Sequence, residues 1–153
     1  MAAPAISTCL WYEKDAEQAA TLYCSLFPDA AITNIFRQHG DPENRAFLVE
    51  FSLMGQSYSA MNGGPHYKLT PAASIFALVE GQHEVDVLWA ALLAGGGQES
   101  RCGWLTDRYG LSWQIIPRAL TRLMQSDKSG RVVQAMMEMV KIDVAALEAA
   151  AKG

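Results

Sequence analysis

The cysteines are the most reactive side chains in this sequence, and their spacing suits neither a zinc site nor a disulfide framework. Cys9, Cys24 and Cys102 are an odd number and form no Cys-x-x-Cys pair. We expect reduced thiols that act as small buried hydrophobic groups. The alternative is a nucleophile, but no neighbouring His or Lys in the sequence would stabilise its thiolate.

The three histidines occupy positions typical of surface or capping residues. His39 falls in an expected loop and His83 at an expected helix start, whereas His66 follows the segment Asn62-Gly-Gly-Pro65. His66 is the best candidate among them for a pocket edge or an acid–base role. Asn62 and the two glycines could offer backbone amides to a ligand, although a turn at a strand exit is the simpler interpretation.

Two common nucleotide-binding signatures are missing from the chain. It contains neither a Gly-x-x-x-x-Gly-Lys-Ser/Thr phosphate loop nor a Gly-x-Gly-x-x-Gly turn. It also lacks the parallel βαβ unit with a Gly-rich turn that usually binds S-adenosylmethionine.

Composition restricts the possible partners. The net charge of −4 would repel phosphate backbones, so we expect no nucleic acid. The first residues have no basic and apolar signal pattern, and no run of about 18 apolar residues would span a membrane, so we expect a cytoplasmic protein. The 18% of charged residues is low for a free monomer and favours a homodimer.

The hydrophobic pattern predicts the same series of elements twice. Strand-like runs at 6–12, 31–37, 46–53 and 57–61 accompany a helix from Asp15, the expected N-cap, to Phe27. The second series is formed by strands near 74–80, 98–102, 104–107 and 112–116 with a helix at 83–93. Residues 118–153 then form a Met- and Ala-rich helical tail, and the loop 62–71 joins the two series.

Short sequence matches support this duplication. Residues 55–61 resemble residues 110–116, each opening with Gly-x-Ser-aromatic, and Leu22-Tyr23 resembles Leu88-Trp89. We therefore predict a single α+β domain, 1–153, with βαβββ modules at 5–62 and 73–117. The modules would form a curved, mixed, eight-stranded sheet with helices on its outer face, and the concave face would be a natural ligand site.

Several motifs resemble the PhnB-like branch of the vicinal-oxygen-chelate superfamily, which includes glyoxalases, bleomycin-resistance proteins and dioxygenases. They are the segments 10–12, 15–17, 22–28, 55–56, 62–65, 102–104, 107–110, 112–117, 141–143 and 145–147. The branch carries the label 3-demethylubiquinone-9 3-methyltransferase. The resemblance covers nearly the whole chain and also implies a homodimer.

Metal-dependent relatives place His or Glu at one inward position on each of four strands. Alignment with that pattern puts Thr8 and Ser74 on the first strands of the modules, and Ser59 and Gln114 on the last strands. Hydroxyls and a neutral amide are poor ligands for such ions, so we expect neither a metal nor another cofactor. A shift of one or two residues would bring Glu50 closer, but one carboxylate cannot build a site.

Strand alternation from these four positions predicts which other side chains share the concave face. It adds Ser57, Leu78, Ser112 and Ile116, together with four candidates for the ligand pocket, namely Leu10, Tyr12, Met61 and Phe76. Asn62, His66 and Trp104 would lie at its mouth. Trp11, Trp89 and Trp113 are expected in the core, and the apolar strand residues could equally fill a closed core.

Three functions remain open. The first is a metal-free protein that binds a small aromatic or aliphatic molecule in the cupped sheet, and the residues favour it. The second is an enzyme that uses polar pocket residues, either as the methyltransferase of the family label or in lyase or isomerase chemistry. The third is a purely structural dimer module.

Overall fold

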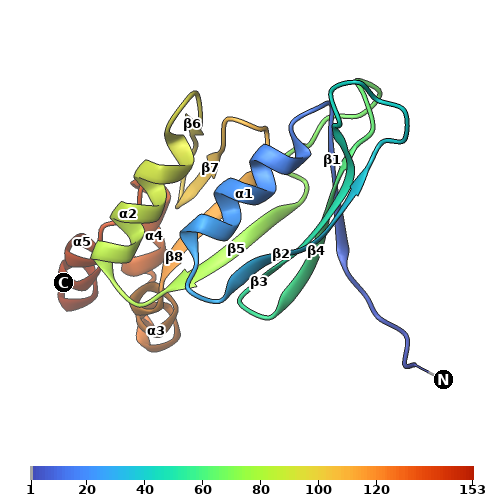
Figure 1. Cartoon of the computed structure of the whole chain (residues 1–153). Coiled ribbons are helices and arrows are strands. Elements are labelled where there is room, and N and C mark those ends of the chain that lie inside the picture. The colour runs from blue at the N-terminus through green and yellow to red at the C-terminus, as the bar shows by residue number, and fades with distance from the viewer. Residues whose placement is uncertain (1) are drawn as a thin grey trace. The chain divides into compact units, whose positions relative to one another are not determined.

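The computed structural model describes residues 2–153 in two compact units, one ending at Leu69 and the other Thr70–Gly153. Each unit holds one βαβββ module, and helices follow the second module (Figure 1). The α+β fold, the two modules, their eight strands and the helical tail are confirmed. None of the described helices is both long and apolar enough to cross a membrane.

The first unit consists of β1 (Thr8–Tyr12), α1 (Ala16–Leu26), β2 (Ala30–Arg37), β3 (Ala46–Leu53) and β4 (Gln56–Asn62). Its sheet has the order β1-β4-β3-β2, in which β1 runs parallel to β4 and the other pairs are antiparallel. Helix α1 packs on β2, β3 and β4 through its buried face, formed by Ala16, Ala19, Ala20 and Tyr23.

The start of α1 differs from the expected capping arrangement. Asp15 is the N-cap residue, but its side chain makes no capping hydrogen bond. The amide of Ala16 instead donates to Asn62 Oδ1 at 2.9 Å, and Asn62 Nδ2 donates to the carbonyl of Ala46 at 2.9 Å. Asn62 thus satisfies an orphan amide of the helix from the end of β4.

The second unit repeats this order. It contains β5 (Ser74–Val79), α2 (Gln82–Leu93), β6 (Gln98–Glu99), β7 (Trp104–Thr106) and β8 (Ser112–Pro117). The sheet order is β5-β8-β7-β6, and β5 runs parallel to β8, as β1 does to β4. Helix α2 contacts β7 and β8 and buries Val85, Leu88, Trp89 and Leu92.

Three tail helices complete the second unit: α3 (Arg118–Ser126), α4 (Arg131–Glu138) and α5 (Val144–Lys152). Their own core joins β8 through a cluster of Ile116, Leu120, Val132, Ile142 and Leu147. The turn before β7 also holds the tail, because the amides of Cys102 and Gly103 donate to the carbonyls of Met139 and Val140 at 2.9 and 2.8 Å. The tail is therefore part of the second unit rather than an appendage.

Asp107 organises the turn between β7 and β8. Its side chain is 3% exposed and accepts hydrogen bonds from the amides of Tyr109 and Leu111 at 2.8 and 3.1 Å. It also accepts from the indole Nε1 of Trp113, a fully buried residue of β8, at 2.9 Å. This carboxylate fixes the direction in which β8 enters the sheet.

Replacing Asp107 with Ala would leave these buried donors without their acceptor. We expect Asp107→Ala to lower the free energy of unfolding by about 2–4 kcal/mol, measured by urea unfolding with circular dichroism. The matched control is Asp127→Ala, because the Asp127 side chain also accepts amide bonds, from Ser129 and Val132, but at the surface. A loss no larger than that of the control would contradict the role of Asp107.

Candidate ligand pocket

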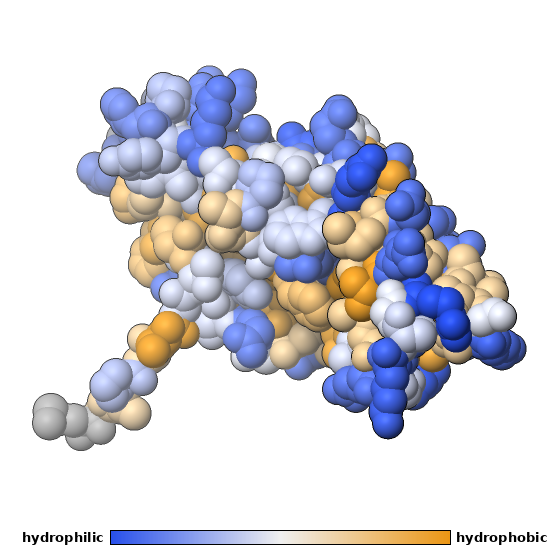
Figure 2. Space-filling model, turned by 180° about the vertical axis from the view of Figure 1, so that it is seen from behind, coloured by the Kyte–Doolittle hydropathy of each residue, from blue (hydrophilic) through white to orange (hydrophobic). Residues whose placement is uncertain are grey.

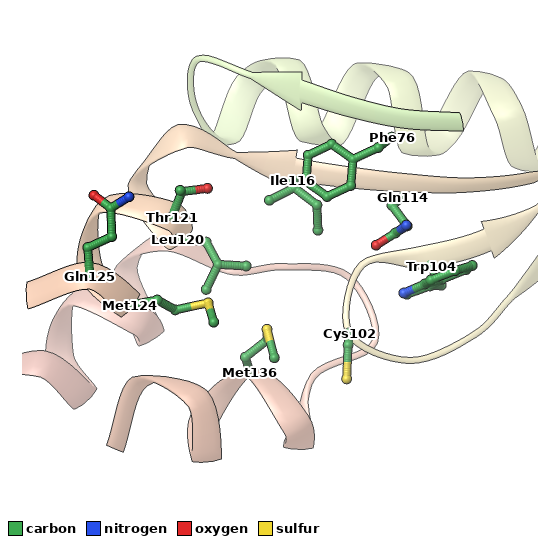
Figure 3. A pocket seen from close by; sticks show the side chains of 10 residues that line it. All are labelled: Phe76, Cys102, Trp104, Gln114, Ile116, Leu120, Thr121, Met124, Gln125 and Met136. Atoms are coloured by element: carbon green, nitrogen blue, oxygen red, sulfur yellow. The ribbon is translucent and has the colours of Figure 1, made fainter. Parts of the chain in front are cut away.

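A cavity of about 450 Å³ lies in the second unit between the sheet and the tail helices (Figure 3). Strands β5, β7 and β8 supply one wall, and α3 and α4 supply the other. The lining residues are Phe76, Cys102, Trp104, Gln114, Ile116, Leu120, Thr121, Met124, Gln125 and Met136.

Strand pairing brings three lining residues into one row. Phe76 of β5 pairs with Gln114 of β8, and Gln114 pairs with Trp104 of β7. Paired residues point to the same side of a sheet, so the three side chains share the face opposite α2. Ile116, two residues along β8, lies on the same face.

Gln114 has a fixed orientation. Its Nε2 donates to Ser74 Oγ at 3.0 Å, across the parallel pair β5 and β8. With the amide nitrogen held in this way, the carbonyl Oε1 faces the pocket as a hydrogen-bond acceptor (Figure 3). The predicted candidates Ser74, Phe76, Trp104 and Gln114 are thus close together in the structure, although Ser74 supports the wall rather than lining it.

The tail supplies half of the lining, and sequence reasoning missed this contribution. Leu120 is 3% exposed and forms the floor of the pocket with Ile116, whereas Thr121, Met124 and Gln125 stand at its rim. Their spacing on one side of α3 is visible in the sequence. The strand face that they adjoin is not, because it depends on how the helix packs.

The pocket is nearly free of ionisable groups. Among the described residues that line it, Cys102 is the single one with an ionisable side chain. Cys102 adopts a positive φ of 58°, and its Sγ lies 3.9 Å from Met137 Sδ. The remaining lining is apolar or carries a neutral amide, hydroxyl or indole N–H group, so the site has no fixed charge to pair with a charged ligand.

The side chains of β1 point to the face of the sheet opposite to the one that the alignment predicted. Thr8 pairs with Tyr58, Leu10 with Ala60 and Tyr12 with Asn62. These residues face α1: Leu10 and Ala60 are buried, and Tyr12 Oη lies 3.0 Å from Tyr23 Oη of that helix. The prediction that Thr8, Leu10 and Tyr12 share a face with Ser59 is therefore wrong, because a shift of one residue moves every side chain of a strand to the other face.

Ser59 and Met61 lie on the open face of the first sheet. In the row through Ser59, Cys9 lies on one side and Glu50 on the other. Glu50 lies beside Ser59 because of the register in which β3 pairs with β4, and it is one carboxylate without a second one beside it in this row. Within residues 2–153, no group of three or more His, Cys, Asp or Glu side chains is arranged to hold a metal ion.

The segment Asn62-Gly-Gly-Pro65 packs against Trp11. The indole Nε1 of Trp11 donates to the carbonyl of Gly64 at 2.9 Å, and its ring meets Tyr67 edge-on with centroids 4.9 Å apart. Trp11 lies on the face away from α1 and is only half-buried, so its expected place in the core is wrong, whereas Trp89 and Trp113 are buried as predicted. His66 is exposed, and the side chain of Asn62 acts as a clamp, since it bonds both the first amide of α1 and the carbonyl of Ala46.

A second hollow, of about 290 Å³, lies in the first unit. Its lining is partly polar. The polar groups come from the hydroxyls of Ser7, Thr33, Ser52, Ser57 and Tyr58 and from the carboxyl group of Glu50. Burial raises the pKa of the Tyr58 hydroxyl.

The contact between Gly63 and Trp11 can be tested by a double-mutant cycle. A Cβ at Gly63 would overlap the indole ring of Trp11. We expect Gly63→Ala to lower the free energy of unfolding by about 1–3 kcal/mol in the natural chain, through overpacking. In a Trp11→Val background the penalty should largely disappear, and an unchanged penalty there would show that the ring is not its cause.

A family model described as 3-demethylubiquinone-9 3-methyltransferase matches residues 4–116. The match contains both modules and ends before the tail helices. No curated protein matches the chain.

Three solved structures show the extent of the similarity. A PhnB protein from Bacillus cereus, described as a candidate 3-demethylubiquinone-9 3-methyltransferase, is 29% identical, with a TM-score of 0.67 over 73% of this chain and 98% of that chain. A protein from Pseudomonas aeruginosa is 17% identical, with a TM-score of 0.63 over 75% of this chain and 98% of that one. A glyoxalase/bleomycin resistance protein from Albidiferax ferrireducens is 12% identical, with a TM-score of 0.49 over 71% and 93%.

The family match covers most of the chain and agrees with the motifs noted in the sequence. The chain therefore belongs to the 3-demethylubiquinone-9 3-methyltransferase family, the PhnB-like family.

Proposed function

We propose that this protein binds an uncharged, largely apolar small molecule in the pocket of the second unit, without a metal ion or another cofactor. The observation that carries the proposal is the row Phe76, Gln114 and Trp104, which places one oriented amide between two aromatic rings beside an apolar floor. A mostly apolar cavity with a few placed polar groups is the usual form of a small-molecule site.

The volume and the lining both support this ligand class. A cavity of about 450 Å³ falls within the range of small-molecule sites, which is roughly 300–1,000 Å³. Phe76 and Met124, which are exposed in the lining, would be removed from contact with water by a bound apolar group, which favours binding. A charged ligand would lose hydration without gaining a partner of opposite charge.

The lining supports binding rather than acid–base catalysis. General acid–base catalysis needs a titratable group within hydrogen-bond reach of the reacting atom. Cys102 is the one ionisable lining residue among those described, and no carboxylate or imidazole stands beside it in the lining. Methyl transfer, which the family description names, has no comparable support from the residues of this pocket.

A pocket-filling substitution tests the site. Compounds that are uncharged and aromatic or aliphatic should raise the melting temperature of the natural protein, because a ligand of the folded state stabilises it. Met124→Trp, at the pocket rim, should abolish this rise. Val133→Trp should retain it, because Val133 is an exposed residue of α4 outside the lining.

Two results of this screen would count against the proposal. One is a screen in which no uncharged compound shifts the melting temperature of the natural protein. The other is a ligand whose stabilising effect is the same in Met124→Trp as in Val133→Trp, since that ligand would bind elsewhere.

We also propose that the protein works as a cytoplasmic homodimer. Large apolar side chains lie exposed on both units, including Phe36, Phe47, Val87 and Val140, and Figure 2 shows apolar areas between hydrophilic ones on one face. Burial against a second copy would remove such side chains from water. Sedimentation equilibrium should give twice the chain mass of 16.7 kDa, and a monomer at micromolar concentration would refute this proposal.

A further inference from the structure

The pocket has polar groups at two ends and an apolar stretch between them (Figure 3). Gln114 and Trp104 form the end on the sheet, whereas Thr121 and Gln125 project from α3 at the other end. The apolar stretch is formed by Phe76, Ile116, Leu120, Met124 and Met136. This division predicts more about a ligand than the overall apolar character does.

The sheet end accepts a hydrogen bond. Gln114 Nε2 donates one of its two hydrogens to Ser74 Oγ, and the carbonyl Oε1 is the atom on the pocket side, so the group offered to a ligand is an acceptor (Figure 3). The matching ligand group is therefore a donor, such as a hydroxyl or an amide N–H. The rings of Phe76 and Trp104 on either side of Gln114 would pack on the carbon atoms that carry this donor.

The helix end is formed by two residues one helical turn apart. Thr121 and Gln125 are spaced i and i+4 on α3, so both side chains lie on the same side of that helix. A hydroxyl and an amide can each donate or accept, which suits a second neutral polar group. Both residues lie beyond residue 116, outside the region that matches the family, so this end belongs to the tail of this chain.

We propose that the ligand is uncharged and elongated, with a hydrogen-bond donor at one end, an apolar middle and a second neutral polar group at the other end. Thr121 and Gln125 select the second end. This inference rests on the proposed function, since it assigns the chemistry of the molecule that the same pocket binds.

Two series of simple phenols test the inference by calorimetry at neutral pH. The 4-alkylphenols carry one donor, and the 4-(ω-hydroxyalkyl)phenols of equal chain length carry a second hydroxyl at the far end of the chain. In the natural protein, the best two-ended compound should bind about threefold to tenfold more tightly than its one-ended counterpart, the value of one neutral hydrogen bond. The 4-alkylbenzoates of equal length should bind more weakly than either series.

Substitutions test which residues of the pocket recognise each end of the ligand. The double variant Thr121→Val, Gln125→Leu should lose the preference for the second hydroxyl but retain its affinity for the 4-alkylphenols. Gln114→Leu should weaken both series. The matched control is Gln134→Leu, an exposed glutamine of α4 that does not line the pocket, and it should change neither affinity.

The outcomes separate this inference from the proposed function. If the alkylphenols bind but the second hydroxyl adds nothing, or if its advantage survives in the Thr121, Gln125 double variant, two-ended recognition is wrong and the pocket remains a binding site. A benzoate that binds as tightly as the phenol overturns the uncharged ligand class. If no compound of any series binds, the proposed function itself fails.

Discussion

The junction of β8 with α3 has no connecting residues, because Ser112–Pro117 is followed at once by Arg118–Ser126. Pro117 is extended, with φ −74° and ψ 144°, and it stands at the N-cap position of α3. The chain therefore turns directly from strand to helix, and Ile116 and Leu120 become neighbours in one buried cluster. The pocket depends on this turn, since it brings the first turns of α3 beside the face of the strand that carries Gln114.

The cluster around Ile116 and Leu120 also extends to the later parts of the tail. Val132 of α4, Leu147 of α5 and Ile142 between them are fully buried in it. Gln82 of α2 adds a polar link, because its Nε2 donates to the carbonyl of Ile142 and its Oε1 accepts from the amide of Val144. Apolar contacts thus hold α3 and α4 against β8, and Gln82 holds the start of α5 against α2.

The two modules share a topology but use the last position of their final strands differently. The matching segments 55–61 and 110–116 place Asn62 and Pro117 at equivalent positions. In the first unit, Asn62 closes the module by holding the start of α1 and the carbonyl of Ala46. In the second unit, the Pro117 side chain makes no such hydrogen bonds, and the residue stands at the start of the tail instead. One duplicated architecture therefore carries a clamp in one copy and a pocket wall in the other.

The sequence alone determined the fold class, the duplication, the family and which side chains of β8 share a face. Gly110 and Pro117 bound β8 on both sides, and the alternation of polar Ser112 and Gln114 with Trp113 and Ile115 sets which residues face α2. Only tertiary structure decided the face of β1, because Leu10, Trp11 and Tyr12 are consecutive large apolar residues without alternation. Their orientation follows from pairing with Tyr58–Asn62. The tail's share of the pocket was likewise decided by packing, since the spacing of a helix shows which residues lie together but not which surface they meet.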